Sequence, residues 1–359
     1  MKVEMKKIKN MNKNTKNNLI TYGIVIVAFI VMQTLISTGS VSSLLEGLMV
    51  PLCIYIILAV SLNLVVGILG ELSLGHAGFM CAGAFSSAFF SKCMKDVIEN
   101  GTLRFILALL IGIAVAAVFG IIIGIPVLRL KGDYLAIVTL AFGEIIKNLV
   151  NVVFIGRDSN GFHFSTKDVM ALNMEPDGEV LVNGPQGITG TPKDSTFLIG
   201  VILILITLFI VINLINSRDG RAIMAIRDNR IAAESVGINI TKYKLMAFTI
   251  SAALAGGAGV LYAHNLSTLT ANTNNFGYNM SINILVFVVL GGIGNIRGSM
   301  IAAVILTLLP ELLRGLSDYR MLIYAIVLIL MMLFNWAPKS IEWREKYLSF
   351  GKKKKEVVK

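Results

Sequence analysis

Charged residues are scarce in this chain, and their scarcity excludes an ordinary soluble domain. Only 15% of the 359 residues are Asp, Glu, Lys or Arg, whereas soluble domains carry about 25%. Hydrophobic residues make up 55% of the chain, and several uninterrupted apolar runs are long enough to cross a bilayer. The composition therefore predicts a protein that crosses a membrane several times.

Cysteine and histidine are also rare, and neither forms a pattern typical of metal or redox chemistry. None of the three cysteines, Cys53, Cys81 and Cys93, belongs to a CxxC pair, and we interpret them as buried small apolar side chains. Paired carboxylates, a nucleophile elbow and metal-ligand spacings are all missing. The sequence therefore predicts no catalytic residue, no metal site and no cofactor, and it does not favour an enzyme.

The phosphate-binding pattern G-x-x-x-x-G-K-[ST] is missing as well. The string "GKKKK" at 351–355 lacks the first glycine and the hydroxyl residue. The string "GGIGNIRG" at 291–298 follows an apolar run without a βαβ unit, so it indicates close helix packing and not a nucleotide loop. If ATP drives this protein, the ATP must bind to a partner chain.

Ten apolar segments are expected to form transmembrane or re-entrant helices. They run over about 19–38, 44–68, 71–91, 103–128, 134–155, 197–216, 245–263, 280–296, 299–314 and 320–337. The first run is long and lacks a cleavage site, so it is interpreted as a span and not as a signal peptide. The third is glycine-rich and the eighth ends in "GGIGN", which makes both candidates for a broken helix. We predict an all-α polytopic membrane protein with a transmembrane domain over 19–337.

The distribution of Lys and Arg predicts the orientation, because these residues translocate poorly. With the N-terminus in the cytoplasm, most of the 32 Lys and Arg residues lie on the cytoplasmic side, in the tails 1–18 and 338–359 and in the 217–244 loop. Ten spans place both tails there and make 156–196 an external loop. Basic tails suit anionic membrane lipid, so the net charge of +11 does not indicate nucleic acid.

The 217–244 loop contains a charged, alanine-rich stretch, "GRAIMAIRDNRIAAESVGINITKYK". On a helical wheel over 221–237, Arg227, Arg230 and Glu234 share one stripe, where Arg230 and Glu234 can pair. Ala225, Ile226, Ala232, Ala233 and Val236 fall on roughly the opposite side.

Two interpretations of this stretch are open. A solvated linker between spans is the simpler one. The face of small residues, however, permits close approach of another backbone, and Gly237 supplies a sharp helix stop. These features favour a helix that docks a soluble partner.

The same stretch resembles a known family. "IAAESVG" is similar to the Glu-Ala-Ala loop of ABC importer permeases, with Ile231 in place of the glutamate. The longer string through residue 263 resembles the branched-chain amino-acid permease group of the LivM type. So do "GELSLGHAGFMCAGAF" (70–85), "TLAFGEIIKNLV" (139–150), "GPQGITG" (184–190) and "VVLGGIGNIRGSMIAA" (288–303), in this order along the chain.

The resemblance implies a multi-chain machine in a bacterial plasma membrane. Such permeases work with a second homologous permease, two cytoplasmic ABC ATPase subunits and an extracytoplasmic solute-binding protein. The Glu-Ala-Ala-type helix sits in a groove of the ATPase and transmits its closure. The ATPase-coupling residues implied here are Arg221, Arg227, Asp228, Arg230, Ala232, Ala233, Glu234 and Gly237.

Polar residues inside the predicted spans are candidates for the substrate path, because such residues are costly in a membrane. Glu144 and Lys147 share one helical face, with Asn148 beside them. They form either a structural ion pair, which we favour, or a site where Glu144 meets a substrate ammonium.

The glycine-rich third segment supplies the other path candidates. Ser73, Gly75 and His76 lie where a broken helix can present N–H groups to a carboxylate. For the lone His76 a packed, hydrogen-bonded histidine is the more common case. Asn63 is expected to join helices more than to bind substrate.

The external loop 156–196 is interpreted either as a flexible connector or as part of a landing surface for the binding protein. For the whole chain, we expect a permease subunit of an ATP-driven importer of leucine, isoleucine and valine. The alternatives are the same machine carrying urea or short amides, and an ion-coupled secondary transporter that works without an ATPase.

Overall fold

Helices dominate the computed structural model, which describes residues 2–39, 42–128, 133–176, 178–313 and 319–336. Each of the ten expected apolar segments contains a helix. In chain order these are α1 (Lys2–Ser37), α2 (Ser43–Asn63), α3 (His76–Cys93), α4 (Gly101–Val127), α5 (Asp133–Val152), α6 (Phe197–Asn216), α9 (Ile240–Ala263), α11 (Tyr278–Gly291), α12 (Ile296–Leu312) and α13 (Arg320–Trp336). The predicted tail 338–359 lies outside the described residues.

Six stretches within the described residues are long and apolar enough to cross a membrane. They are Asn18–Ser37, Ser43–Leu69, Gly101–Val127, Tyr134–Val152, Phe197–Asn216 and Ile240–Ala263. The multi-pass membrane fold predicted from the sequence is thereby confirmed. The count of ten spans is approximate, because α11 has 14 residues and spans only about 21 Å at about 1.5 Å per residue.

Glycines let three central helices approach closely. A Cβ atom added to Gly83 of α3 would lie 2.4 Å from the Gly256 carbonyl oxygen of α9, and one added to Gly259 would lie 2.1 Å from the Met80 carbonyl oxygen. Gly256 also faces Ala116 of α4. Larger residues here would force the backbones apart, so 254–263 is a close-packing face.

The second span does not end as a regular α-helix. After Asn63 the backbone winds into a π-helical turn, η1 (Leu64–Leu69), all of it buried. Gly70 ends the turn in the left-handed region, at φ 79° and ψ 21°. Residues 70–75 then connect to α3, so the break predicted from the glycine-rich sequence is confirmed.

The loop 156–196 is folded, which excludes the interpretation as a flexible connector. Strands β1 (Phe154–Asp158), β2 (Gly161–Ser165) and β3 (Glu179–Asn183) form an antiparallel sheet in the order β2-β1-β3. Two 3-10 turns, η2 (Met170–Leu172) and η3 (Gly184–Gln186), accompany it, and β4 (Ile188–Thr189) pairs with β5 (Thr268–Leu269). Adjacent residues Leu181 and Val182 of "EVLVN" point to opposite faces of the strand and both are buried, so both faces of β3 are covered at this point.

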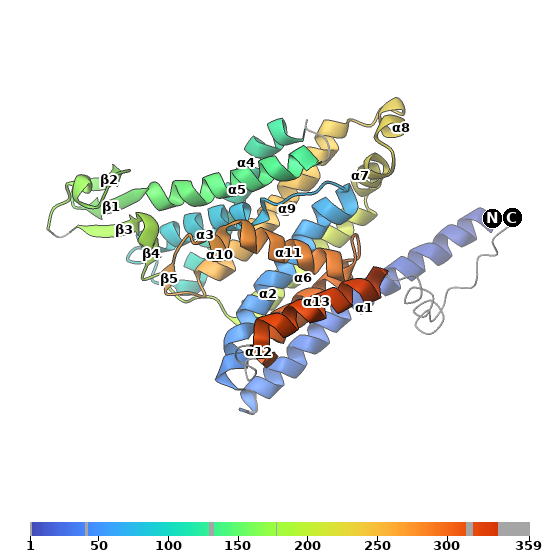
Figure 1. The fold of residues 1–359 in the computed structure, drawn as a ribbon, viewed down its shortest axis with the longest axis horizontal. Helices are drawn as coiled ribbons and strands as arrows, with labels where there is room; N and C mark the ends of the chain where they lie inside the picture. The colour runs from blue at the N-terminus through green and yellow to red at the C-terminus, as the bar shows by residue number, and fades with distance from the viewer. Residues whose placement is uncertain (1, 40–41, 129–132, 177, 314–318, 337–359) are drawn as a thin grey trace. The chain divides into compact units, whose positions relative to one another are not determined.

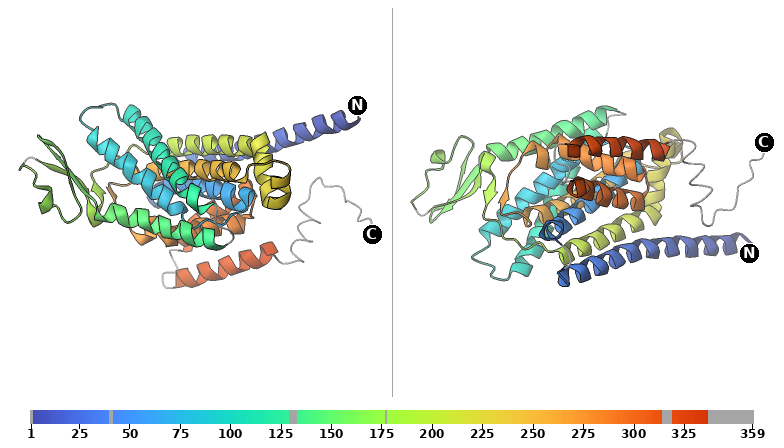
Figure 2. Two further views of the ribbon diagram at one scale, coloured as in Figure 1. Left: turned by 90° about the horizontal axis from the view of Figure 1, so that it is seen from above. Right: turned by 60° about the horizontal axis from the view of Figure 1, so that its bottom comes forward.

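Three short helices connect the later spans. They are α7 (Arg218–Asp228), α8 (Arg230–Ser235) and α10 (Thr273–Phe276). Within residues 1–304, which form one compact unit, the β1–β3 sheet lies at one end of the helix bundle and α7 and α8 at the other (Figures 1 and 2). Residues 305–359 form a second unit, which contains α13.

Candidate functional site

The stretch expected to form one docking helix is divided into α7 and α8. Asn229 separates them in an extended conformation, with φ −156° and ψ 105°. The Asn229 side chain accepts a hydrogen bond from the Ala232 N–H at 3.0 Å and so caps the start of α8. The single helix predicted over 221–237 is therefore wrong, because an extended residue resets the helical phase.

Helix α8 presents apolar side chains to its surroundings. Ile231 is 81% exposed and Val236 is 75% exposed, and Ala232 is exposed beside them. Ala233, in contrast, is only 3% exposed and packs on Ile226 and Ile240 of its own chain. Of the two predicted alanines, Ala232 is the one available to a partner.

Gly237 ends α8 as predicted. Its φ of 85° lies in the left-handed region, which favours glycine. The Gly237 N–H donates to the Glu234 carbonyl at 3.0 Å, and the Ile238 N–H donates to the Ala233 carbonyl at 3.1 Å. This pair of bonds is the Schellman motif, which satisfies the last carbonyls of a helix.

The arginines of this segment have different partners. Arg227 donates from Nη1 to the Gly67 carbonyl at 2.9 Å, and from Nε and Nη2 to Asp228 Oδ1 at 3.1 and 3.0 Å. Arg221 donates to the Asn216 carbonyl at 3.1 Å. The predicted Arg230–Glu234 pair is not found among the ion pairs of the described residues, although α8 (Arg230–Ser235) contains both residues.

Residue Asn63 joins helices, as the sequence favoured. It is 1% exposed. Its Nδ2 donates to Ser299 Oγ at 2.9 Å, and its Oδ1 accepts from the Gly294 N–H at 2.8 Å. The amide thus bonds through both its nitrogen and its oxygen and joins α2 to the start of α12.

Of the other candidates at the helix break, His76 and Gly75 are held by the chain itself, and Ser73 is not. His76 Nε2 lies 2.7 Å from Ser61 Oγ, and the Ser61 hydroxyl donates to the Leu58 carbonyl, so Nε2–H is the donor to Ser61. A Cβ atom on Gly75 would lie 2.2 Å from the Thr139 carbonyl oxygen. Ser73 Oγ is buried and has no hydrogen-bond partner within the described part of the chain.

Glu144 and Lys147 form the ion pair that the sequence favoured. Lys147 Nζ donates to Glu144 Oε2 at 2.5 Å and to Thr273 Oγ1 at 3.2 Å. Glu144 Oε1 accepts from the Tyr278 N–H at 2.8 Å, at the first residue of α11. The pair therefore fixes α10 and α11 against α5.

Asn148 lies on an outward face of α5. The exposed positions of this helix follow helical spacing and are otherwise mainly apolar: Tyr134, Ile137, Val138, Ala141, Ile145, Asn148, Leu149 and Val152. On α11, Tyr278, Ile282 and Asn283 are exposed. Neither Asn148 nor Asn283 has a hydrogen-bond partner among the described residues. Unpaired amides on membrane-spanning helices are costly when they face lipid.

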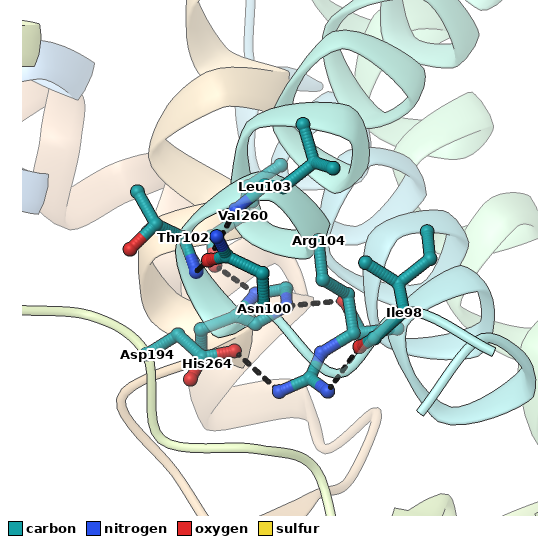
Figure 3. Close-up of polar contacts among 9 residues, drawn as sticks. Ile98, Asn100, Thr102, Leu103, Arg104, Asp194, Val260 and His264 are labelled. Atoms are coloured by element: carbon teal, nitrogen blue, oxygen red, sulfur yellow. Dashed lines mark hydrogen bonds and ion pairs between the residues drawn. The ribbon is translucent and has the colours of Figure 1, made fainter. Parts of the chain in front are cut away.

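A polar network ties α3, α4 and α9 together at the end of the bundle that carries the sheet (Figure 3). Arg104 donates to Asp194 at 3.1 Å and to the Ile98 carbonyl at 3.3 Å. His264 bonds the Val260 carbonyl through Nδ1 at 2.9 Å and Ser91 through Nε2 at 2.7 Å. Burial lowers the pKa of the His264 imidazole. Because the Val260 carbonyl oxygen can only accept, Nδ1–H is the donor to it.

Sequence reasoning missed two contacts near the helix break. Lys244 of α9 forms an ion pair with Glu71, and Ser281 of α11 accepts a hydrogen bond from the Ala77 N–H at 3.1 Å. Lys244 directly precedes the apolar run 245–263, where a cytoplasmic lysine is expected, so the sequence carried no signal for this buried pair. Among the residues that the structure describes, no group of His, Cys, Asp and Glu could hold a metal ion.

Comparison with known proteins assigns the family. The model of the "branched-chain amino acid transport system / permease component" family matches residues 44–334. The LivM permease proteins of Salmonella typhimurium and Escherichia coli are each 36% identical over 297 residues, covering 80% of this chain and 67% of theirs. The LivH permease protein of Escherichia coli is 25% identical over 286 residues, covering 78% of this chain and 88% of its own length.

No solved structure matches the chain. The family model nevertheless covers most of the sequence, including α7, α8 and the helix break at residues 70–75. The chain belongs to the permease-component family of branched-chain amino-acid transport systems.

Proposed function

We propose that this chain is the membrane permease subunit of an ATP-driven importer for leucine, isoleucine and valine. The match of residues 44–334 to the branched-chain amino-acid permease family carries this proposal. ATP hydrolysis belongs to separate partner chains, and a solute-binding protein delivers the cargo. The chain itself is a transport subunit and not an enzyme.

The ATPase docks on α8. The support is geometric: a short helix with a cap at each end holds Ile231, Ala232 and Val236 exposed. Exposed apolar side chains of this size favour a protein contact. Because Ile231 stands where the family pattern has glutamate, this docking is more apolar than that pattern implies.

A second permease covers the face that includes Asn148, Tyr278 and Asn283. The support is the cost of leaving unpaired amides in lipid, together with the likeness of the chain to both LivM and LivH permease proteins. The cargo passes along this face. The ammonium and carboxylate groups of the cargo then meet amide side chains. An amide oxygen accepts hydrogen bonds from an ammonium, and an amide nitrogen donates to a carboxylate.

This proposal moves the path away from most of the residues that the sequence suggested. Asn63 bonds Ser299 and Gly294, His76 Nε2 bonds Ser61, and Glu144 is held by Lys147 and α11. An engaged ion pair is also a poor relay for a coupling ion, which argues against a secondary transporter. Of the path candidates, Asn148 is retained.

The orientation follows from the charge distribution. Both termini and the 217–244 segment lie in the cytoplasm, where the basic tails contact anionic lipid of a bacterial plasma membrane. The β1–β3 sheet then lies outside, where the solute-binding protein arrives. Its position at the end of the bundle away from α7 and α8 supports this assignment (Figure 1).

Substitution of Ala232 by Trp tests the docking. The larger side chain keeps the partner surface from closing on α8, so the ATPase no longer co-purifies and uptake is lost while the chain stays in the membrane. Ala233→Trp is the matched comparison, and it lowers stability by about 1–3 kcal/mol through overpacking. Normal ATPase recovery with Ala232→Trp would contradict the docking role of α8.

The cargo is tested on the partner binding protein. Its melting temperature is measured with leucine, isoleucine, valine and urea. We expect an increase with the three branched-chain amino acids and none with urea. If only urea or short amides raised the melting temperature, the proposed cargo would be wrong, but the proposed ATP-driven importer would stand.

A further inference from the structure

The 217–244 segment contacts the membrane part at the π-helical turn η1. The Arg227 guanidinium donates to the Gly67 carbonyl at 2.9 Å. Its side-chain carbons cover Gly70, where an added Cβ atom would lie 2.5 Å from Arg227 Cγ. Just beyond the turn, Lys244 forms its ion pair with Glu71, and the Lys244 side chain is only 4% exposed.

These contacts suit the end of a helix. The last carbonyls of a helix have no partner within it, and a cation near them is favoured by the helix dipole. Arg227 supplies both the donor and the charge. Asp228 holds the guanidinium through two further hydrogen bonds, so α7 and the turn are joined by an oriented side chain.

On its other side the same turn contacts the start of α12. A Cβ atom on Gly67 would lie 2.3 Å from the Gly294 nitrogen. Asn63, one turn earlier, accepts from that same Gly294 N–H and donates to Ser299. Residues 63–71 therefore lie between the cytoplasmic segment and the glycine-rich loop that begins α12.

A π-turn is a suitable place for a change of helical register. Such turns are rare, occur mostly as single turns within α-helices and are frequent at functional sites. Return to α-helical bonding would shift the following residues by about one position, or about 100° around the axis and about 1.5 Å along it. That shift would move the 70–75 break and its contacts.

We propose that η1 is the joint through which α7 moves the membrane-spanning helices, and that Arg227 is the positioning residue that holds this joint. ATPase movement reaches α8, passes to α7, and changes η1 through the Arg227–Gly67 contact. The change then reaches α12 through Asn63 and Gly67. This inference rests on the proposed ATP-driven importer.

The test uses the complete transporter in liposomes and measures both ATP hydrolysis and uptake. Arg227→Ala keeps the exposed face of α8, so the complex assembles and hydrolyses ATP, but uptake per ATP falls about tenfold or more. Arg227→Lys keeps a hydrogen-bond donor and a positive charge, and it restores part of the uptake per ATP. The matched control is Arg218→Ala, an exposed arginine at the start of the same helix with no partner among the described residues, and it leaves the ratio unchanged.

Unchanged uptake per ATP with Arg227→Ala would overturn the role of Arg227 while leaving the importer assignment intact. Wild-type uptake that needs no ATP would instead overturn the proposed function. Hydrogen exchange of the turn gives a readout that needs no transport. In the isolated chain, Arg227→Ala speeds exchange over residues 64–71 relative to Arg218→Ala, and equal exchange in the two variants would also contradict the proposal.

Discussion

At the residue scale, the polar side chains within the spans mostly hold the fold together. Asn63, His76 and Lys147 are each at most 7% exposed and each bonds another part of the chain. The sequence indicated which side chains are costly in a membrane, and it favoured a structural role for all three. The partners Ser299 of Asn63 and Thr273 of Lys147 could not be predicted, because each lies more than a hundred residues away.

Removing Glu144 is expected to destabilise the protein more than removing the whole pair. Glu144→Ala leaves the buried Lys147 ammonium without its carboxylate, which costs about 3–5 kcal/mol. Replacing Lys147 by Met in the same chain removes the uncompensated charge and recovers most of that loss. Thermal unfolding in detergent measures the stability of the single variant and of the double variant. Equal melting temperatures for the single and double variants would show that the pair is not buried as described.

The sheet is expected to depend on pH through Asp158. Burial raises the pKa of this carboxyl, but hydrogen bonds from the Glu175 and Asn160 N–H groups and from His163 outweigh it and hold the pKa below its usual value. A lowered pKa stabilises the fold above the ordinary Asp value of about 3.9 and loses that effect as the pH falls. The protection factors for hydrogen exchange over 154–183, which are corrected for the intrinsic pH dependence of exchange, should therefore fall at acid pH. Asp158→Asn should remove most of this pH dependence.

At the scale of elements, the helical wheel located a helical segment and its glycine stop, but it treated two helices as one and so misplaced the phase of the second. The reason is a single residue, Asn229, whose side chain caps α8 while its backbone is extended. Asparagine favours a cap over a helix interior, so Asn229 was itself a signal for a break that the helical wheel did not take into account. The sheet was missed for a related reason: its strands have five residues each and lie in a polar segment.

The cap at Asn229 provides a prediction about α8 as an element. Asn229→Ala removes the side-chain acceptor of the Ala232 N–H and weakens the helix by about 1 kcal/mol. We expect less ATPase to be recovered with the chain, while Asn229→Asp, which keeps the acceptor, retains it. Recovery is measured by affinity purification from membranes. Loss of ATPase with Asn229→Asp alone would point to surface charge and not to the cap.

At the scale of the whole molecule, the assigned orientation places α8 and the β1–β3 sheet on opposite sides of the membrane. A single cysteine at Ser235 or Lys167 tests it, in a chain whose buried Cys53, Cys81 and Cys93 are replaced by alanine. In intact cells, a membrane-impermeant thiol reagent should label the Lys167→Cys chain. It should label the Ser235→Cys chain only after the membrane is opened. Labelling of both in intact cells would contradict the orientation.

The source of energy is the central claim for the whole molecule, and transport in liposomes tests it most directly. Uptake of radiolabelled leucine is measured with this chain, the second permease and the binding protein, with and without the ATPase subunits. The account predicts uptake only when the ATPase is present and hydrolyses ATP. Uptake driven by an ion gradient in the absence of the ATPase would contradict it.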